Sequence, residues 1–167
     1  MIKLSCYILT KNSEKHLESI LNKIQEISDE IIIIDSGSTD RTKKIIEEFE
    51  RTKFIFKEFL NFKDQRIYAE QQCANDYIFF LDSDEIPDSS LIESIKKIKQ
   101  HGLKHDAYRI KRKWQVLGEK VRCVYPIVSP DYPIRLYNKN TTSFNKSTYV
   151  HETPSGYKSV GILSGEI

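Results

Sequence analysis

Three carboxylates follow directly on an apolar run near the middle of the chain. Residues 77–81, Tyr-Ile-Phe-Phe-Leu, have the composition of a buried strand, and the next four residues are Asp82, Ser83, Asp84 and Glu85. Carboxylates this close repel one another. A hard divalent cation would relieve the repulsion, and oxygen ligands favour Mg²⁺ or Mn²⁺. The alternative is an ordinary acidic loop at a helix start, but the position at the end of an apolar strand favours a cation site.

A second polar cluster also follows an apolar run. Residues 31–34 are four consecutive isoleucines, typical of a strand buried on both faces, and Asp35 opens the sequence Asp-Ser-Gly-Ser-Thr-Asp. A carboxylate here can accept hydrogen bonds from a base or ribose, while Gly37 allows close approach of the backbone. Taken alone, the stretch is better interpreted as a strand-to-helix turn in which Ser38 and Thr39 cap the helix.

The surrounding pattern predicts the elements that position these clusters. Apolar runs predict strands over 3–9, 31–34, 54–56 and 77–81, and apolar residues at helical spacing predict helices over 17–27, 63–75 and 88–101, the last ending at Gly102. A further helix is expected after Ser38 and Thr39, with its apolar stripe at Ile45, Ile46 and Phe49. Strands that alternate with helices imply βαβ crossovers, hence an α/β fold with a mainly parallel central sheet and helices on both faces. Ligands of such sheets gather at the carboxyl ends of the strands, where both acidic clusters fall.

The last third of the chain has a different character. Residues 1–100 carry 15 Lys+Arg and 19 Asp+Glu, a net charge of −4, whereas residues 101–167 carry 11 and 5, a net charge of +6. Arg109, Lys111 and Lys113 alternate with Tyr108, Ile110 and Arg112, which suits an exposed strand, and residues 134–137 predict another. The basic strand can face a phosphorylated acceptor, an anionic membrane surface or simply solvent.

The composition excludes several classes of protein. No stretch approaches the roughly 18 apolar residues of a membrane span, and the N-terminus lacks the pattern of a signal peptide, so a cytoplasmic protein is expected. The three cysteines are too far apart to predict a disulfide framework or a zinc cluster. P-loop and dinucleotide-binding glycine motifs are absent from the sequence. No nucleic-acid partner is expected.

The motifs taken together resemble glycosyltransferase family 2, the inverting enzymes of GT-A fold. The matching stretches are Ile-Leu-Thr-Lys-Asn over 8–12, Glu-Ile-Ile-Ile-Ile-Asp-Ser-Gly-Ser-Thr-Asp over 30–40, and Tyr-Ile-Phe-Phe-Leu-Asp-Ser-Asp-Glu over 77–85. They keep the family's order and approximate spacing. The nearest branch includes the bacterial lipopolysaccharide-core glucosyltransferases, in which a later Val-His-Glu recurs, here Val150-His151-Glu152.

The resemblance implies a role for each matching position. Thr10 and Asn12 line the nucleotide pocket, and Asp35 holds the uracil or ribose. Arg66 approaches the base or diphosphate; relatives often have asparagine after it, where this chain has Ile67. In the remaining motif Asp82 contacts the ribose, Ser83 belongs to the nucleotide site, and Asp84 binds the Mg²⁺ or Mn²⁺.

The resemblance also places His151 and Glu152 beside the acceptor. Taken alone, the pair suggests an ordinary surface pair, or a zinc hydrolase motif; the latter fails because Ser155 stands where the second histidine would fall and Pro154 disfavours a helix. Glu152 is the candidate base, with His151 as its catalytic neighbour, because an acceptor hydroxyl becomes a good nucleophile when a positioned carboxylate takes its proton. Asp131 is the main rival.

The expected function is inverting transfer of a sugar from a nucleoside diphosphate sugar, most readily a UDP-sugar, to a saccharide or glycolipid acceptor. Lipopolysaccharide or other surface-glycan synthesis and peripheral contact with the inner face of the membrane are further expectations. Residues 1–167 would be one domain, with a nucleotide-sugar-binding half over 1–100 and an acceptor-side half over 101–167, incomplete at its C-terminal end. Two alternatives stay open: a sugar-phosphate nucleotidylyltransferase, although its usual glycine-rich loop is missing, and a non-catalytic nucleotide-binding module.

Overall fold

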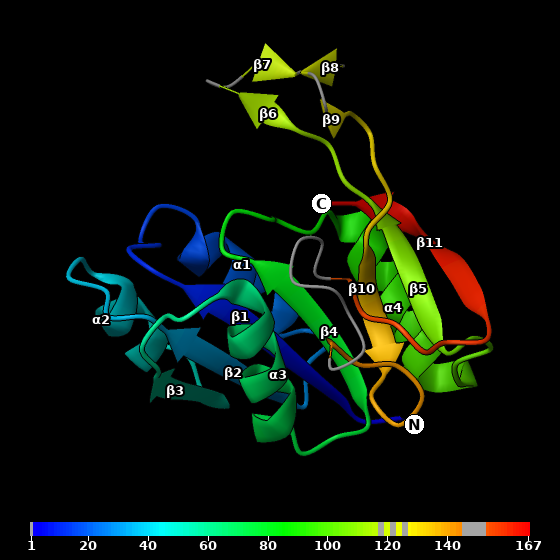
Figure 1. Ribbon diagram of the computed structural model, residues 1–167, viewed down its shortest axis with the longest axis horizontal. Coiled ribbons are helices and arrows are strands. Elements are labelled where there is room, and N and C mark those ends of the chain that lie inside the picture. Colours follow the sequence, from blue (N-terminus) through cyan, green and yellow to red (C-terminus); the bar gives the residue numbers. More distant parts are fainter. Residues whose placement is uncertain (1, 117–118, 121–122, 125–126, 145–152) are drawn as a thin grey trace.

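A computed structural model describes residues 2–116, 119–120, 123–124, 127–144 and 153–167 (Figure 1). The strands of the main sheet are β1 (Leu4–Thr10), β2 (Glu30–Asp35), β3 (Thr52–Phe56), β4 (Tyr77–Asp82), β5 (Ala107–Lys111), β10 (Ile134–Asn138) and β11 (Val160–Glu166). The helices are α1 (Leu17–Ile24), α2 (Thr42–Glu47), α3 (Phe62–Gln72) and α4 (Ser89–His101). Each strand and helix predicted from the sequence is present, with ends shifted by a few residues.

The sheet is mainly parallel, as predicted. Its strand order is β11-β5-β10-β4-β1-β2-β3, and β10 alone runs against its neighbours β4 and β5. The chain moves outward from β1 to β2 and β3, then returns to place β4 on the other side of β1. The order therefore switches direction between β1 and β4, which is where open α/β sheets bind their ligands.

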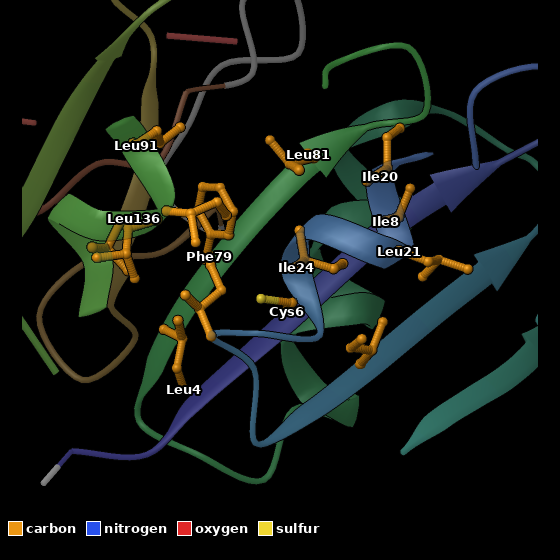
Figure 2. Close-up of a cluster of buried hydrophobic side chains, with 14 of the residues drawn as sticks. Leu4, Cys6, Ile8, Ile20, Leu21, Ile24, Phe79, Leu81, Leu91 and Leu136 are labelled. Atoms are coloured by element: carbon orange, nitrogen blue, oxygen red, sulfur yellow. The ribbon is translucent and has the colours of Figure 1, made fainter. Parts of the chain in front are cut away.

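Helices cover both faces of the sheet. On one face, the apolar sides of α1, α2 and α4 pack on β1, β2 and β4, and Figure 2 shows part of this cluster around Phe79 and Leu81. On the other face, Ala69 of α3 and Cys73, which follows the helix, pack in a smaller cluster that includes Tyr7 and Phe80. This two-sided burial explains why β2 and β4 consist almost entirely of apolar residues.

Two features of the last third differ from the prediction. β5 is an interior strand that pairs with β10 and β11, and its Tyr108 and Ile110 are buried, so the prediction of an exposed strand was wrong. The alternation of charged and apolar residues arises because only one set of side chains packs into the core. β11 was missed in the sequence, since its Gly161 and Gly165 weaken a strand pattern.

Short strand pairs extend from the end of β5. β6 (Gln115–Val116) pairs with β7 (Glu119–Lys120), and β8 (Cys123–Val124) pairs with β9 (Ile127–Val128), both antiparallel. They project away from the main sheet in Figure 1. No helix in the described part of the chain is long and apolar enough to cross a membrane.

The ends of α4 agree with the sequence prediction, whereas the start of α2 does not. The Asp88 side chain caps α4 by accepting from the Leu91 amide at 2.7 Å, and Gly102 ends the helix with φ +88°, at the position predicted from the sequence. Ser38 and Thr39 do not cap α2, which begins after Arg41 without a side-chain cap. The Ser38 and Thr39 side chains instead bind the loop that follows β1.

Candidate functional site

The carboxyl edge of the sheet brings the predicted site residues together. Thr10, Asp35 and Asp82 end β1, β2 and β4, and these strands are adjacent. Because β10 runs the other way, it begins at this edge, and its second residue is Arg135. Charged groups thus lie on both sides of the switch point between β1 and β4: Asp35 on one side, and Asp82 and Arg135 on the other.

The Asp35 carboxylate organises its own turn. It is 2% exposed and accepts hydrogen bonds from the Thr10 hydroxyl at 2.8 Å, the Ser38 hydroxyl at 2.5 Å, and the Gly37 and Ser38 amides at 2.8 Å each. Gly37 takes φ +86°, which favours glycine at this turn. Four donors on one buried carboxylate support the turn interpretation for the free protein. Contact of Asp35 or Thr10 with a nucleotide stays a prediction.

The loop after β1 is tied to this turn. The Asn12 amide donates to the Ser38 hydroxyl, and the Asn12 side-chain oxygen accepts from the Thr39 amide, both at 2.8 Å. The Lys11 ammonium donates to the carbonyls of Ser36 and Gly37. Asn12 itself has φ +50° and is exposed. The two loops form one polar surface beside the switch point, where the sequence predicted the nucleotide.

Both oxygens of Asp82 are held by arginines. Oδ1 accepts from Arg66 Nη2 at 2.6 Å, and Oδ2 accepts from Arg135 Nη2 at 3.0 Å. The two guanidiniums lie over the same Phe80 ring, 5.1 and 4.7 Å from its centroid. Burial would raise the pKa of Asp82, but the charges of Arg66 and Arg135 hold it below its ordinary value. Asp82 is therefore an anion near neutral pH with both oxygens engaged.

Glu85 connects this pair to the end of β5. It is 6% exposed, and its carboxylate accepts from Arg135 Nε at 2.8 Å, Arg135 Nη2 at 2.6 Å, Arg112 Nη1 at 3.1 Å and the Asp82 amide at 3.1 Å. Arg112 also binds Asp131 through two nitrogens, at 3.0 and 2.5 Å. We call these contacts the arginine–carboxylate cluster, which consists of Arg66, Arg112 and Arg135 with Asp82, Glu85 and Asp131.

Asp84 stands apart from the arginine–carboxylate cluster. It is exposed and has no hydrogen bond or ion pair within the described residues, while Ser83 beside it is half-buried. No group of three or more potential metal-ligating side chains occurs in the described parts of the chain. A protein site of one carboxylate still fits Mg²⁺ or Mn²⁺, because such ions are commonly held by one or two carboxylates together with substrate phosphates and water.

An open pocket of about 520 Å³ lies beside the cluster. Its lining residues are Arg66, Asp82, Arg109, Arg112, Asp131, Tyr132, Pro133, Ile134, Arg135, Thr153 and Pro154. Arg109 donates to the Tyr132 carbonyl at 2.8 Å and has no carboxylate partner in the described structure. Lys111 and Lys113, by contrast, both pair with Glu166 of β11. Of the alternating basic residues Arg109, Lys111 and Lys113, Arg109 is the one that lines the pocket.

A buried glutamate lies one helical turn from Arg66. Glu70 is 8% exposed and accepts from the Phe144 amide at 3.1 Å. Burial raises its pKa to about 7, against the opposing effect of that hydrogen bond. Because the folded protein keeps this proton up to a pH at which an unfolded chain has lost it, stability falls as the pH rises between about 4.5 and 7.

Glu70→Gln is expected to remove this pH dependence. Between pH 5 and pH 8 the free energy of unfolding of the variant should gain about 2 to 3 kcal/mol relative to the parent protein, the linkage value of a shift of this size. Urea unfolding of both proteins at the two pH values measures the gain. Glu47→Gln, on an exposed position of α2, is the matched control and should show almost no gain. A Glu70→Gln difference that is constant with pH would contradict the assignment.

The proposed acceptor-side residues His151 and Glu152 lie outside the described residues. Thr153 and Pro154, which follow them, line the pocket. The rival base Asp131 is described, and both of its oxygens are engaged by Arg112. A carboxylate held in this way is poorly placed to take a proton from a hydroxyl group, which favours Glu152 without testing it.

Sequence reasoning missed the countercharges of the acidic loop. The repulsion among Asp82, Asp84 and Glu85 favoured a cation that would relieve it, whereas Arg112 and Arg135 neutralise much of that charge. A signal was present: Arg135 interrupts the apolar run 134–137. Arg112 falls in phase with the buried Tyr108 and Ile110. A charged residue at a buried strand position usually has a partner.

Comparison with known sequences identifies relatives. A family model described as Glycosyl transferase family 2 matches residues 5–151. An uncharacterized glycosyltransferase of Rickettsia typhi is 35% identical over 147 residues, covering 86% of this chain and 49% of that protein. The lipopolysaccharide core biosynthesis glycosyltransferase LpsC of Rhizobium meliloti is 25% identical over 160 residues, covering 90% and 56%. The chain thus spans about half the length of the curated relatives it matches.

Comparison with solved structures confirms the fold. A crystal structure of a TarS fragment from S. aureus in complex with UDP has a TM-score of 0.70 at 20% identity, covering 99% of this chain and 60% of that one. Glucosyl-3-phosphoglycerate synthase from Mycobacterium tuberculosis, in complex with Mn²⁺, UDP and phosphoglyceric acid, has a TM-score of 0.55 at 19% identity, covering 66% and 43%. The predicted GT-A type of α/β fold is correct.

Proposed function

This chain belongs to glycosyltransferase family 2, and we propose on that premise that it binds a UDP-sugar and transfers the sugar with inversion to a saccharide or glycolipid acceptor. The observation that carries the proposal lies at one sheet edge: Asp84 has no partner among the described residues, and Asp82, two residues earlier, lines the arginine-lined pocket. A nucleoside diphosphate needs both a cation and positive side chains near its phosphates.

The donor would lie across the switch point of the sheet. Its nucleoside would lie on the polar loops around Asn12 and Asp35, and its diphosphate would extend toward Asp84 and Arg66. The TarS structure in complex with UDP-GlcNAc and the synthase structure with Mn²⁺ and UDP support this choice of donor and cation by analogy of fold.

The protein's own groups would act on the leaving diphosphate and on the acceptor. Bound Mg²⁺ or Mn²⁺ would supply a Lewis acid for the phosphate oxygens. Arg66 is 7% exposed and its guanidinium donates to Asp82; this fixed positive group would stabilise negative charge that develops on the diphosphate. Glu152 would accept the proton of the attacking acceptor hydroxyl, with His151 beside it. Attack from the face opposite the diphosphate would invert the anomeric carbon.

The acceptor side of the proposal rests on charge. Arg109 lines the pocket and has no carboxylate partner among the described residues, so an acceptor that carries phosphate or carboxylate groups would be attracted. The similarity to LpsC supports a saccharide of lipopolysaccharide or another surface glycan. Such an acceptor would bring the protein to the inner face of the membrane.

A thermal-shift screen of nucleotide sugars with and without Mn²⁺ tests the function. A ligand that binds only the folded state raises the melting temperature, and 100 times its dissociation constant gives about 2.7 kcal/mol. We expect UDP-sugars with Mn²⁺ to give the largest rise. Release of UDP from that donor in the presence of a saccharide acceptor would establish transfer. Binding without release would indicate a non-catalytic module, and absence of any nucleotide-dependent shift would overturn the proposal.

A further inference from the structure

Arg135 occupies a position that the family motifs do not assign. It is the second residue of β10, 6% exposed, and it reaches the loop after β4 from the one antiparallel strand of the sheet. Its guanidinium bridges two carboxylates of that loop, at 3.0 Å to Asp82 and 2.6 Å to Glu85. Arg135 also lines the pocket. The side chain thus contacts the acidic loop on one side and faces the proposed diphosphate space on the other.

The charges of the arginine–carboxylate cluster balance. Three guanidiniums contact three carboxylates, and Asp84 is the additional carboxylate of the loop, without a countercharge in the described structure. The net charge of these seven groups is therefore −1. One negative charge attracts a divalent cation weakly, and it repels an incoming diphosphate weakly as well.

We propose that Arg135 is a positioning residue, an inference that rests on the proposed function. It makes the Asp82–Glu85 loop bind the cation together with the diphosphate rather than the cation alone. By neutralising Asp82 and Glu85, it keeps the loop from concentrating enough negative charge to hold a cation before the nucleotide arrives. By holding Asp82 in place, it leaves the Asp84 carboxylate to meet a cation that the diphosphate brings. The binding of the nucleotide thereby raises the affinity for the cation, and the binding of the cation raises the affinity for the nucleotide.

Removal of the Arg135 charge should change two affinities in opposite directions. The loop of Arg135→Met would carry one more uncompensated negative charge, so Mn²⁺ alone should bind more tightly, while UDP without metal should bind more weakly. Each change should be about tenfold, the scale of one unit charge a few ångströms from a partly solvated ion. A mutation that merely loosened the loop would weaken both ligands, so the opposed signs separate positioning by charge from a structural role.

The experiment uses purified protein and two probes. Electron paramagnetic resonance of the unbound ion measures the affinity for Mn²⁺ alone, and calorimetry measures the affinity for UDP in EDTA and in saturating Mn²⁺. Arg135→Lys keeps the charge without the forked contact and should leave Mn²⁺ affinity within about threefold of the parent protein. Glu85→Gln removes a negative charge from the same contact and should lower Mn²⁺ affinity, the reverse of Arg135→Met.

Lys96→Met is the matched control for loss of one positive charge. Lys96 pairs with Glu26 and Glu93 on the exposed side of α4, away from the pocket, and its loss should move neither affinity. Circular dichroism checks that each variant is folded. If Arg135→Met does not fold, the test is the contrast between Glu85→Gln, which should lower Mn²⁺ affinity, and Arg135→Lys, which should leave it within about threefold of the parent protein. Parallel loss of both ligands, or no change in either, overturns the proposal. A parent protein that binds no UDP in Mn²⁺ overturns the proposed function instead.

Discussion

Mn²⁺-dependent UDP affinity is expected to fall about 100-fold in Asp84→Asn, the upper end of the range for loss of a residue that supports a metal ligand. The reason is that Asp84 is the one carboxylate of its loop without a partner in the described structure, so an amide there removes the charged oxygen available to a cation. UDP affinity in EDTA should stay within about twofold. Because Asp84 is exposed and unpaired, stability should change by less than about 0.5 kcal/mol.

Calorimetry with UDP in Mn²⁺ and in EDTA measures the effect, and urea unfolding measures stability on the same samples. Asp76→Asn is the matched control, because Asp76 precedes the same strand at its opposite end, far from the carboxyl edge. It should change neither of the two UDP affinities. Equal Mn²⁺-dependent affinity in Asp84→Asn and the parent protein would remove Asp84 from the metal site.

Glu152→Gln is expected to lower the rate of sugar transfer by about 10²-fold or more, the usual scale for loss of a positioned base. The affinity for the UDP-sugar should stay nearly unchanged, since the side chain is expected to act on the acceptor hydroxyl. Acceptor-dependent UDP release by the full-length protein measures transfer, and calorimetry measures donor binding. A KM for the donor that stays constant while kcat falls would locate the defect in the chemical step.

Asp131→Asn is the companion variant. Because both oxygens of Asp131 are bound to Arg112, the substitution should disturb an ion pair at the pocket wall and lower kcat by less than about tenfold. Normal turnover in Glu152→Gln together with a loss of 10²-fold or more in Asp131→Asn would move the base to Asp131.

The parallel part of the fold could be predicted because each of its strands and helices is marked by a local sequence pattern. Four consecutive isoleucines in β2 and five apolar residues in β4 predict buried strands without reference to any partner, and the helices between them fix the crossover connections. Since the carboxyl ends of these strands share one edge, the strand pattern was enough to place Asp35 and Asp82 on the same side of the sheet.

The arginine–carboxylate cluster could not be predicted in the same way. Its contacts join residues 16 to 53 positions apart, and they depend on the register and direction of β10. An apolar pattern identifies a strand but gives neither the strand's neighbours in the sheet nor its direction. The contact between Arg135 and Asp82 therefore could not be predicted from the sequence alone. The same limit applies to β5. The alternation of side chains correctly predicted a strand, but it wrongly predicted an exposed strand in place of an interior one.

The contact between Arg112 and Asp131 closes a loop as well as lining a pocket. The Arg112 amide donates to the Asp131 carbonyl at 2.8 Å, the Asp131 amide donates to the Arg112 carbonyl at 3.2 Å, and the two side chains form a forked ion pair. Arg112 and Asp131 are the stems of residues 113–130, which leave the sheet at this point, and these contacts hold the stems together. The entropy of closing such an excursion grows only with the logarithm of its length, and each doubling costs about 0.6 kcal/mol. Insertions and deletions between the stems therefore cost little folding free energy, and a change in the length of this segment is expected to leave the strands on either side in place.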